Sequence, residues 1–102
     1  MTDSKYGGEK MYIILVYDIS FDAKGKRILP KVFKICKKYL FHIQDSVFEG
    51  ELTLSQIANL EAELSKVIRK DMDSIIIFKS RNEKWLQKEF LGRQDDSTSM
   101  FL

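Results

Sequence analysis

Three stretches of the chain have the hydrophobic pattern of β-strands. Residues 11–17 (MYIILVY) form an unbroken apolar and aromatic run that ends at Asp18. This run is rich in strand formers and too short for a buried helix, so it predicts a central strand. Residues 74–78 (SIIIF) have the same character and predict an interior strand. Residues 41–52 alternate only in part and contain polar residues and a glycine, which predicts one bent strand with a bulge or two short strands.

Two segments between these strands have apolar residues at helical spacing. We predict the first helix over residues 29–39, with Pro30 in its first turn, where the missing N–H costs nothing. The apolar side of this helix consists of Val32, Ile35 and Tyr39, with Ile28 just before its start at the same spacing. Cys36 lies beside that side and is predicted to be a small core residue. We predict the second helix over residues 54–70, because Thr53 and Gln56 match a capping box at its start.

The order of the predicted elements defines the fold class. A strand, a helix, a broken strand pair, a second helix and a last strand match the α+β, ferredoxin-like βαββαβ plan with an antiparallel sheet. An additional C-terminal strand or tail follows. We expect residues 1–10 to be a flexible leader, residues 11–92 to be a single domain, and residues 93–102 to be a tail that docks on its own domain or on a partner subunit, since that tail ends in apolar residues.

Positive charge is concentrated in one segment. The net charge is only +2, but residues 23–44 hold seven Lys or Arg and no acidic residue. Four of these side chains share one side of the first predicted helix, and we call them the basic stripe: Arg27, Lys31, Lys34 and Lys38. A basic stripe of this kind predicts binding to the phosphates of nucleic acid. A solvated helix face is the alternative interpretation.

Composition excludes several classes of protein. One cysteine forms no internal disulfide, and one histidine with one cysteine cannot build a zinc site. The chain has no run of about 18 apolar residues, no secretory signal pattern and no phosphate-binding glycine motif after a strand. We therefore expect a cytoplasmic protein that does not interact with membranes.

Asp18 is the strongest candidate for chemistry. It directly follows the first predicted strand, where a rigid sheet can hold a carboxylate at a fixed point, although a turn or capping aspartate is the alternative. Mg²⁺ usually takes one or two protein carboxylates and completes its shell with water and substrate phosphates. A two-fold axis near the strand end would supply a second Asp18. His42 is interpreted as a structural or surface histidine, with a phosphate contact as the alternative.

Three short motifs resemble one known family. Residues 17–19 (YDI) after the first strand, Gln44 with residues 46–49 (SVFE), and residues 73–75 (DSI) before the last strand resemble the smaller of the two universal CRISPR adaptation proteins. The resemblance spans residues 11–92. It implies a ferredoxin-like homodimer that assembles with the CRISPR integrase during spacer acquisition. It also implies a Mg²⁺-dependent endonuclease acting on RNA or DNA, with Asp18 binding the metal at the dimer axis.

The resemblance assigns roles to further residues. Arg27, His42 and Phe48 stand where the family places residues important for nuclease activity, and Tyr17 accompanies Asp18 in its motif. His42 occupies a position that is often arginine in the family, which argues against hydrolysis. Two alternatives to a nuclease therefore remain open. One is a non-catalytic DNA-binding adaptor, and the other is a ferredoxin-like toxin or regulatory dimer unrelated to CRISPR.

Overall fold

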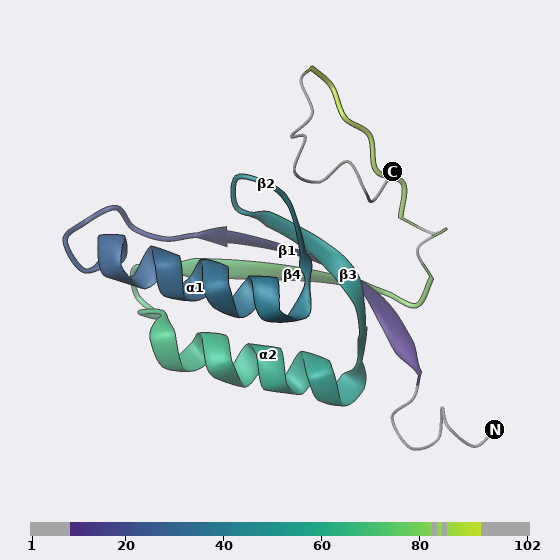
Figure 1. Cartoon of the computed structure of the whole chain (residues 1–102), viewed down its shortest axis with the longest axis horizontal. Coiled ribbons are helices and arrows are strands. Elements are labelled where there is room, and N and C mark those ends of the chain that lie inside the picture. The colour runs from purple at the N-terminus through teal and green to yellow at the C-terminus, as the bar shows by residue number, and fades with distance from the viewer. Residues whose placement is uncertain (1–8, 83, 85, 93–102) are drawn as a thin grey trace.

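The protein forms two layers, a four-stranded sheet and two helices that cover one of its faces (Figure 1). The computed structural model describes residues 9–82, 84 and 86–92. The elements in chain order are β1 (Lys10–Asp18), α1 (Gly25–Tyr39), β2 (Phe41–Gln44), β3 (Val47–Thr53), α2 (Leu54–Val67) and β4 (Ser74–Ser80). The predicted α+β, ferredoxin-like order is confirmed. The expected tail, residues 93–102, lies outside the described residues, as do residues 1–8 of the expected leader.

The sheet has the strand order β2-β3-β1-β4, with every neighbouring pair antiparallel. The prediction that residues 11–17 form a central strand is confirmed. The prediction that residues 74–78 form an interior strand was wrong, because β4 is an edge strand. Its alternate residues Ile75 and Ile77 pack toward the helices, while Ile76 and Phe78 are 51% and 52% exposed on the opposite face. Both faces of β4 are apolar, but the two helices cover only the face that carries Ile75 and Ile77.

The first helix begins earlier than predicted, at Gly25 rather than residue 29. Asp22 stabilises this start, because its carboxylate accepts a hydrogen bond of 2.7 Å from the Gly25 N–H and its carbonyl accepts one from the Lys26 N–H. Pro30 therefore lies inside the helix, so its placement in the first turn was wrong. A Cβ atom at Gly25 would lie 1.7 Å from the Ser20 carbonyl oxygen, so only glycine permits this close approach.

The interrupted segment 41–52 forms two strands, which settles the alternative that the sequence left open. A turn at Asp45 and Ser46 joins them, with Asp45 at a φ of 43°, and the pairing shifts register between His42 and Gln44. The capping box at Thr53 is confirmed by hydrogen bonds in both directions. The second helix ends at Val67 instead of residue 70, and after Val67 the chain turns toward β4.

The core lies between the sheet and the two helices. Its fully buried side chains are Ile13, Leu15, Val32, Cys36, Phe48 and Leu60. The predicted burial of Cys36 is confirmed, and burial raises the pKa of its thiol to about 12. Within the part of the chain that the structure describes, no helix is long and apolar enough to cross a membrane.

Candidate functional site

Asp18 is the last residue of β1 and is exposed to solvent. Side chains alternate between the faces of a strand, and Tyr17 belongs to the core, so Asp18 points to the face that the helices leave uncovered. We call this side of the sheet the bare face. Asp18 lies opposite Ser74 in the register of β1 and β4. Among the described residues, its carboxylate has no hydrogen-bond or ion-pair partner, so it is available to bind a ligand.

A cluster that sequence reasoning missed holds the loop after Asp18. Arg69 bonds both carboxylate oxygens of Asp22 through Nη1, at 2.9 and 2.8 Å. It also bonds Asp73, with Nη2 at 3.0 Å from Oδ1 and Nε at 3.1 Å from Oδ2. Asp73 in turn accepts a hydrogen bond of 2.9 Å from the Ser20 N–H. We call Arg69, Asp22 and Asp73 the Arg69 clamp, and it fixes the β1–α1 loop against the α2–β4 turn.

The Arg69 clamp is strongly charge-assisted. The side chain of Asp73 is fully inaccessible to solvent, and its hydrogen bonds from Arg69 lower the pKa of its carboxyl to about 2. Hydrogen bonds from Arg69 and then from the Gly25 N–H also lower the pKa of Asp22. The sequence did contain one signal, since Arg69 and Asp73 are four residues apart at a helix end and Asp73 directly precedes an apolar strand. Asp22 and Asp73 are therefore committed to structure, whereas Asp18 is not.

The residues expected to support Asp18 form an aromatic cluster on the other side of the sheet. The Phe48 ring centroid lies 6.0 Å from that of Tyr17, 4.9 Å from that of His42 and 5.4 Å from that of Phe33. Nε2 of His42 is 2.9 Å from the Asp45 carbonyl oxygen. Burial, followed by the neighbouring Cys36 and Asp45, raises the pKa of Tyr17. The structure brings Tyr17, His42 and Phe48 together, but they lie on the helix-covered face and Asp18 lies on the bare face.

The basic stripe follows α1 and divides into two parts. Arg27, Lys31 and Lys34 are exposed and have no ion-pair partner in the described residues. Lys38 is paired, with Nζ 2.6 Å from a carboxylate oxygen of Glu63, whose other oxygen accepts a hydrogen bond from the Tyr39 hydroxyl. These two hydrogen bonds lower the pKa of Glu63, and the bond to Glu63 raises the pKa of Lys38. The first three cations are therefore the ones available to phosphates.

The bare face is covered only in part by the chain's own C-terminal segment. Lys88 Nζ lies 2.6 Å from both carboxylate oxygens of Glu49, a buried residue of β3 that also accepts a hydrogen bond from the Tyr12 hydroxyl. This contact holds residues 88–91 against the part of the bare face that β1, β2 and β3 form, next to Ile14 and Val47. Ile76 and Phe78 of β4 remain about half exposed within the part of the chain that the structure describes.

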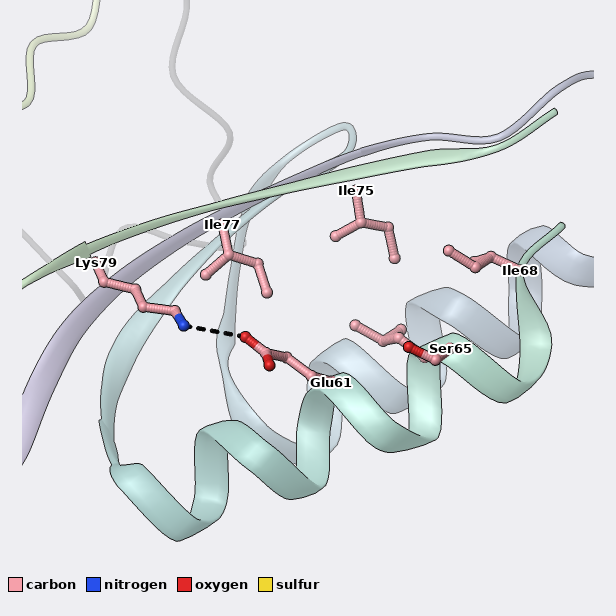
Figure 2. A pocket seen from close by; sticks show the side chains of 7 residues that line it. Glu61, Ser65, Ile68, Ile75, Ile77 and Lys79 are labelled. Atoms are coloured by element: carbon pink, nitrogen blue, oxygen red, sulfur yellow. Dashed lines mark ion pairs between the residues drawn. The ribbon is translucent and has the colours of Figure 1, made fainter. Parts of the chain in front are cut away.

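A groove of about 380 Å³ opens between α2 and β4 (Figure 2). Ile75 and Ile77 point into it from the strand, and the pair Glu61 and Lys79, 3.1 Å apart, lies at one end. These residues belong to the helix-covered face. The groove is therefore separated by the sheet from Asp18 and is not part of the candidate site.

One copy of the chain offers no ready-made cluster of metal ligands in its described ranges. No group of three or more His, Cys, Asp or Glu side chains is arranged to hold an ion in the described ranges. Asp18 offers one free carboxylate, which suits the small number of protein ligands that Mg²⁺ takes. Any further ligands would come from a second copy of the chain, from substrate phosphates or from water.

Comparisons with known proteins give a consistent result. The family model described as CRISPR associated protein Cas2 matches residues 11–88. A protein of Fusobacterium nucleatum named CRISPR-associated endoribonuclease Cas2 is 61% identical over 98 residues, covering 96% of this chain and 92% of the relative. A Moorella thermoacetica protein named CRISPR-associated endoribonuclease Cas2 2 is 42% identical over 91 residues, covering 88% of this chain and all of that protein.

Solved structures agree with this result. A crystal structure described as that of cas2 superposes with a TM-score of 0.74 at 34% identity, covering 85% of this chain and 92% of the other. The crystal structure of Streptococcus pyogenes Cas2 at pH 6.5 gives a TM-score of 0.70 at 28% identity, covering 79% of this chain and 99% of that one.

Proposed function

The chain belongs to the Cas2 family of CRISPR-associated proteins, and on that premise we propose that it is a nucleic-acid-binding homodimer with Mg²⁺-dependent endonuclease activity. We further propose that the dimer assembles with the CRISPR integrase during spacer acquisition. The names of its relatives support an endoribonuclease, and RNA is therefore the substrate we test first. Family membership removes the reason for the second alternative to a nuclease, a toxin or regulatory dimer unrelated to CRISPR.

The observation that carries the nuclease proposal is the uncommitted carboxylate of Asp18. Arg69 pairs with two aspartates, Asp22 and Asp73, whereas Asp18, at the end of a central strand, has no partner in the described part of the chain. The Arg69 clamp holds the loop that follows, so the carboxylate sits on a rigid support. A fixed and unpaired carboxylate at the end of a strand can hold a cation at a defined place.

The bare face supports the homodimer. Ile76 and Phe78 expose apolar surface that a second copy of the same face would bury, and a self-complementary patch is what a two-fold dimer requires. Asp18 lies on this face at the end of the adjacent strand. Pairing the β4 sides of two copies would therefore bring two Asp18 carboxylates toward one axis, with one Mg²⁺ between them.

In this arrangement each residue has a definite task. Asp18 of each subunit would hold the ion, and Mg²⁺ when bound there supplies charge neutralisation at the scissile phosphate and activation of a water molecule. Arg27, Lys31 and Lys34 would bind the phosphates on either side, since they are exposed and unpaired in the described part of the chain. Tyr17, His42 and Phe48 would support the strand ends through packing, because their rings meet in the core and not at Asp18.

The decisive experiment compares Asp18→Asn with wild type in a Mg²⁺-dependent cleavage assay on single-stranded RNA, with EDTA as the metal-free control. We expect the variant to lose cleavage and to keep its dimeric state and its nucleic-acid affinity. Asp71→Asn is the matched control, because Asp71 is an exposed aspartate in the α2–β4 turn. Cleavage retained by a rigorously purified Asp18→Asn protein would refute the nuclease proposal.

A second candidate function is a DNA-binding adaptor without catalysis. The exposed cations of the basic stripe favour it, since they bind duplex phosphates whether or not Asp18 holds a metal. A spacer-acquisition assay separates the two functions, because an adaptor keeps its activity in the Asp18→Asn variant. Charge reversal at Lys31 and Lys34 should weaken duplex binding and lower its salt slope by about one unit per lysine. Reversal at Lys66 and Lys70, exposed lysines beyond the stripe, is the control, and an unchanged slope at Lys31 and Lys34 would exclude their phosphate role.

A further inference from the structure

Phe21 is a highly exposed aromatic side chain close to the candidate site. It lies in the loop between β1 and α1, three residues after Asp18, and 76% of its surface is accessible. A single exposed apolar residue is ordinary on a protein surface. Two observations distinguish Phe21 from such cases. Hydrogen bonds fix the loop that carries it, and positive charges surround its ring.

The residues on both sides of Phe21 are fixed to the rest of the protein. On one side, the Ser20 N–H donates a hydrogen bond of 2.9 Å to the buried carboxylate of Asp73. On the other side, Asp22 is bonded to Arg69 at 2.8 and 2.9 Å and caps α1 through the Gly25 N–H. The backbone therefore presents the Phe21 ring to solvent on a rigid loop. A ring presented in this way loses little conformational freedom when a ligand binds.

Positive charge surrounds the ring. Lys26 Nζ lies 5.0 Å from the Phe21 ring centroid, which is within the range of a cation–π contact. Lys24 and Arg27, in the same turn of chain, are also exposed and have no ion-pair partner in the described residues. An aromatic face flanked by unpaired cations matches the two halves of a nucleotide, a flat base and an anionic phosphate.

We propose that Phe21 is a stacking platform for an unpaired base of a nucleic-acid strand, and that Lys24 and Lys26 bind the phosphates beside that base. This inference rests on the proposed nucleic-acid function and specifies its ligand. A base inside a duplex has no free face, so the site would favour single strands and unpaired strand ends over continuous duplex. Because Phe21 follows Asp18 by three residues, an unpaired nucleotide bound there would lie on the loop that leaves the candidate site.

The test uses the full-length protein and measures binding of oligo-U, oligo-dT and a closed DNA hairpin by fluorescence anisotropy. Phe21→Ala and Phe21→Leu should both weaken single-strand binding about tenfold, since stacking needs a π face that leucine lacks. Phe21→Tyr should bind as wild type does, and binding to the hairpin should change less than about twofold in all three variants. Leu54→Ala is the control, because Leu54 is 57% exposed and is the first residue of α2. The start of α2 lies at the opposite end of the helix layer from the β1–α1 loop (Figure 1).

A direct signal of stacking comes from a tryptophan at the site. The sequence has one tryptophan, Trp85, so Phe21→Trp is made in a Trp85→Phe background. Oligo-dT should quench the fluorescence of this variant and leave Leu54→Trp in the same background unquenched. Equal quenching of both variants would overturn the proposal.

The possible outcomes distinguish a failure of the stacking site from a failure of the proposed nucleic-acid-binding function. If wild type binds single strands and Phe21→Ala binds them equally well, the stacking site is overturned and the proposed nucleic-acid function stands. Absence of any binding by wild type would overturn both. Unchanged oligonucleotide binding together with weaker capture of the integrase would assign Phe21 to a protein contact and would also overturn the proposal.

Discussion

The backbone N–H of Ser20 donates a hydrogen bond of 2.9 Å to the carboxylate of Asp73, a residue 53 positions later in the chain. This contact ties the loop after β1 to the residue before β4 and lies beside the pairing of Asp18 with Ser74. Arg69, two residues after α2, completes the arrangement by donating hydrogen bonds to both Asp73 and Asp22. The position of Asp18 and the outward orientation of Phe21 both depend on these bonds.

Removing the Asp73 carboxylate should destabilise the fold. In Asp73→Ala the Ser20 N–H and the Arg69 guanidinium lose a carboxylate that is itself inaccessible to solvent, so we expect a loss of about 2 kcal/mol in the free energy of unfolding. Urea denaturation followed by circular dichroism measures it. Asp71→Ala, an exposed residue of the same turn, should change the value by less than about 0.5 kcal/mol. Equal effects of the two substitutions would show that the clamp contributes nothing.

The stability of the protein should fall in acid for the same reason. The Arg69 hydrogen bonds lower the pKa of Asp73 from its ordinary value of 3.8 to about 2. A carboxyl group with a lowered pKa stabilises the folded state above pH 3.8 and loses that contribution as the pH falls toward 2. The difference in urea midpoint between wild type and Asp73→Asn should therefore be largest near neutral pH and should shrink toward pH 2. A difference independent of pH would contradict this assignment.

A second pH dependence is expected in alkali. Burial raises the pKa of the Cys36 thiol from 9.0 to about 12, so the folded state holds the neutral thiol more strongly than the unfolded chain does. A raised pKa of this kind gives stability that is complete below pH 9.0 and is lost as the pH rises toward 12. Cys36→Ala should remove the loss of stability that ionisation of the thiol causes in alkali. The pKa of Tyr17 is also raised, so the loss of stability due to Tyr17 should remain in this variant. In folded wild type, thiol reagents should modify Cys36 only as fast as the protein opens.

The exposed residues of β4 should control the oligomeric state. We expect wild type to sediment as a dimer and Ile76→Glu to sediment as a folded monomer, because the substitution places a charge in the apolar patch that a second copy would bury. Met72→Glu is the control, since Met72 is also exposed but lies in the turn before β4. Circular dichroism checks that the variants fold. A wild-type monomer, or an Ile76→Glu protein that remains dimeric, would exclude this face as the dimer interface.

Local chemistry explains the features that the sequence predicted correctly. The apolar runs at residues 11–17 and 74–78 form strands, and the Thr53 capping box begins α2, because each signal involves residues next to one another in the chain. The alternation of a strand also places Tyr17 and Asp18 on opposite faces, a consequence of the period of two that needs no knowledge of the fold. The burial of Cys36 in the core follows from its spacing in α1 in the same way.

The features that the sequence did not predict depend on residues far apart. The early start of α1 rests on Asp22, and Asp22 is held by Arg69, which lies 47 positions later. The edge position of β4 was missed because an apolar run indicates that the faces of a strand are covered and does not say which strands pair beside it. Hydrophobic periodicity thus determined the elements and the faces of their side chains. Only the tertiary structure decided which carboxylate stays free, because that depends on which aspartates the folded chain brings within reach of Arg69.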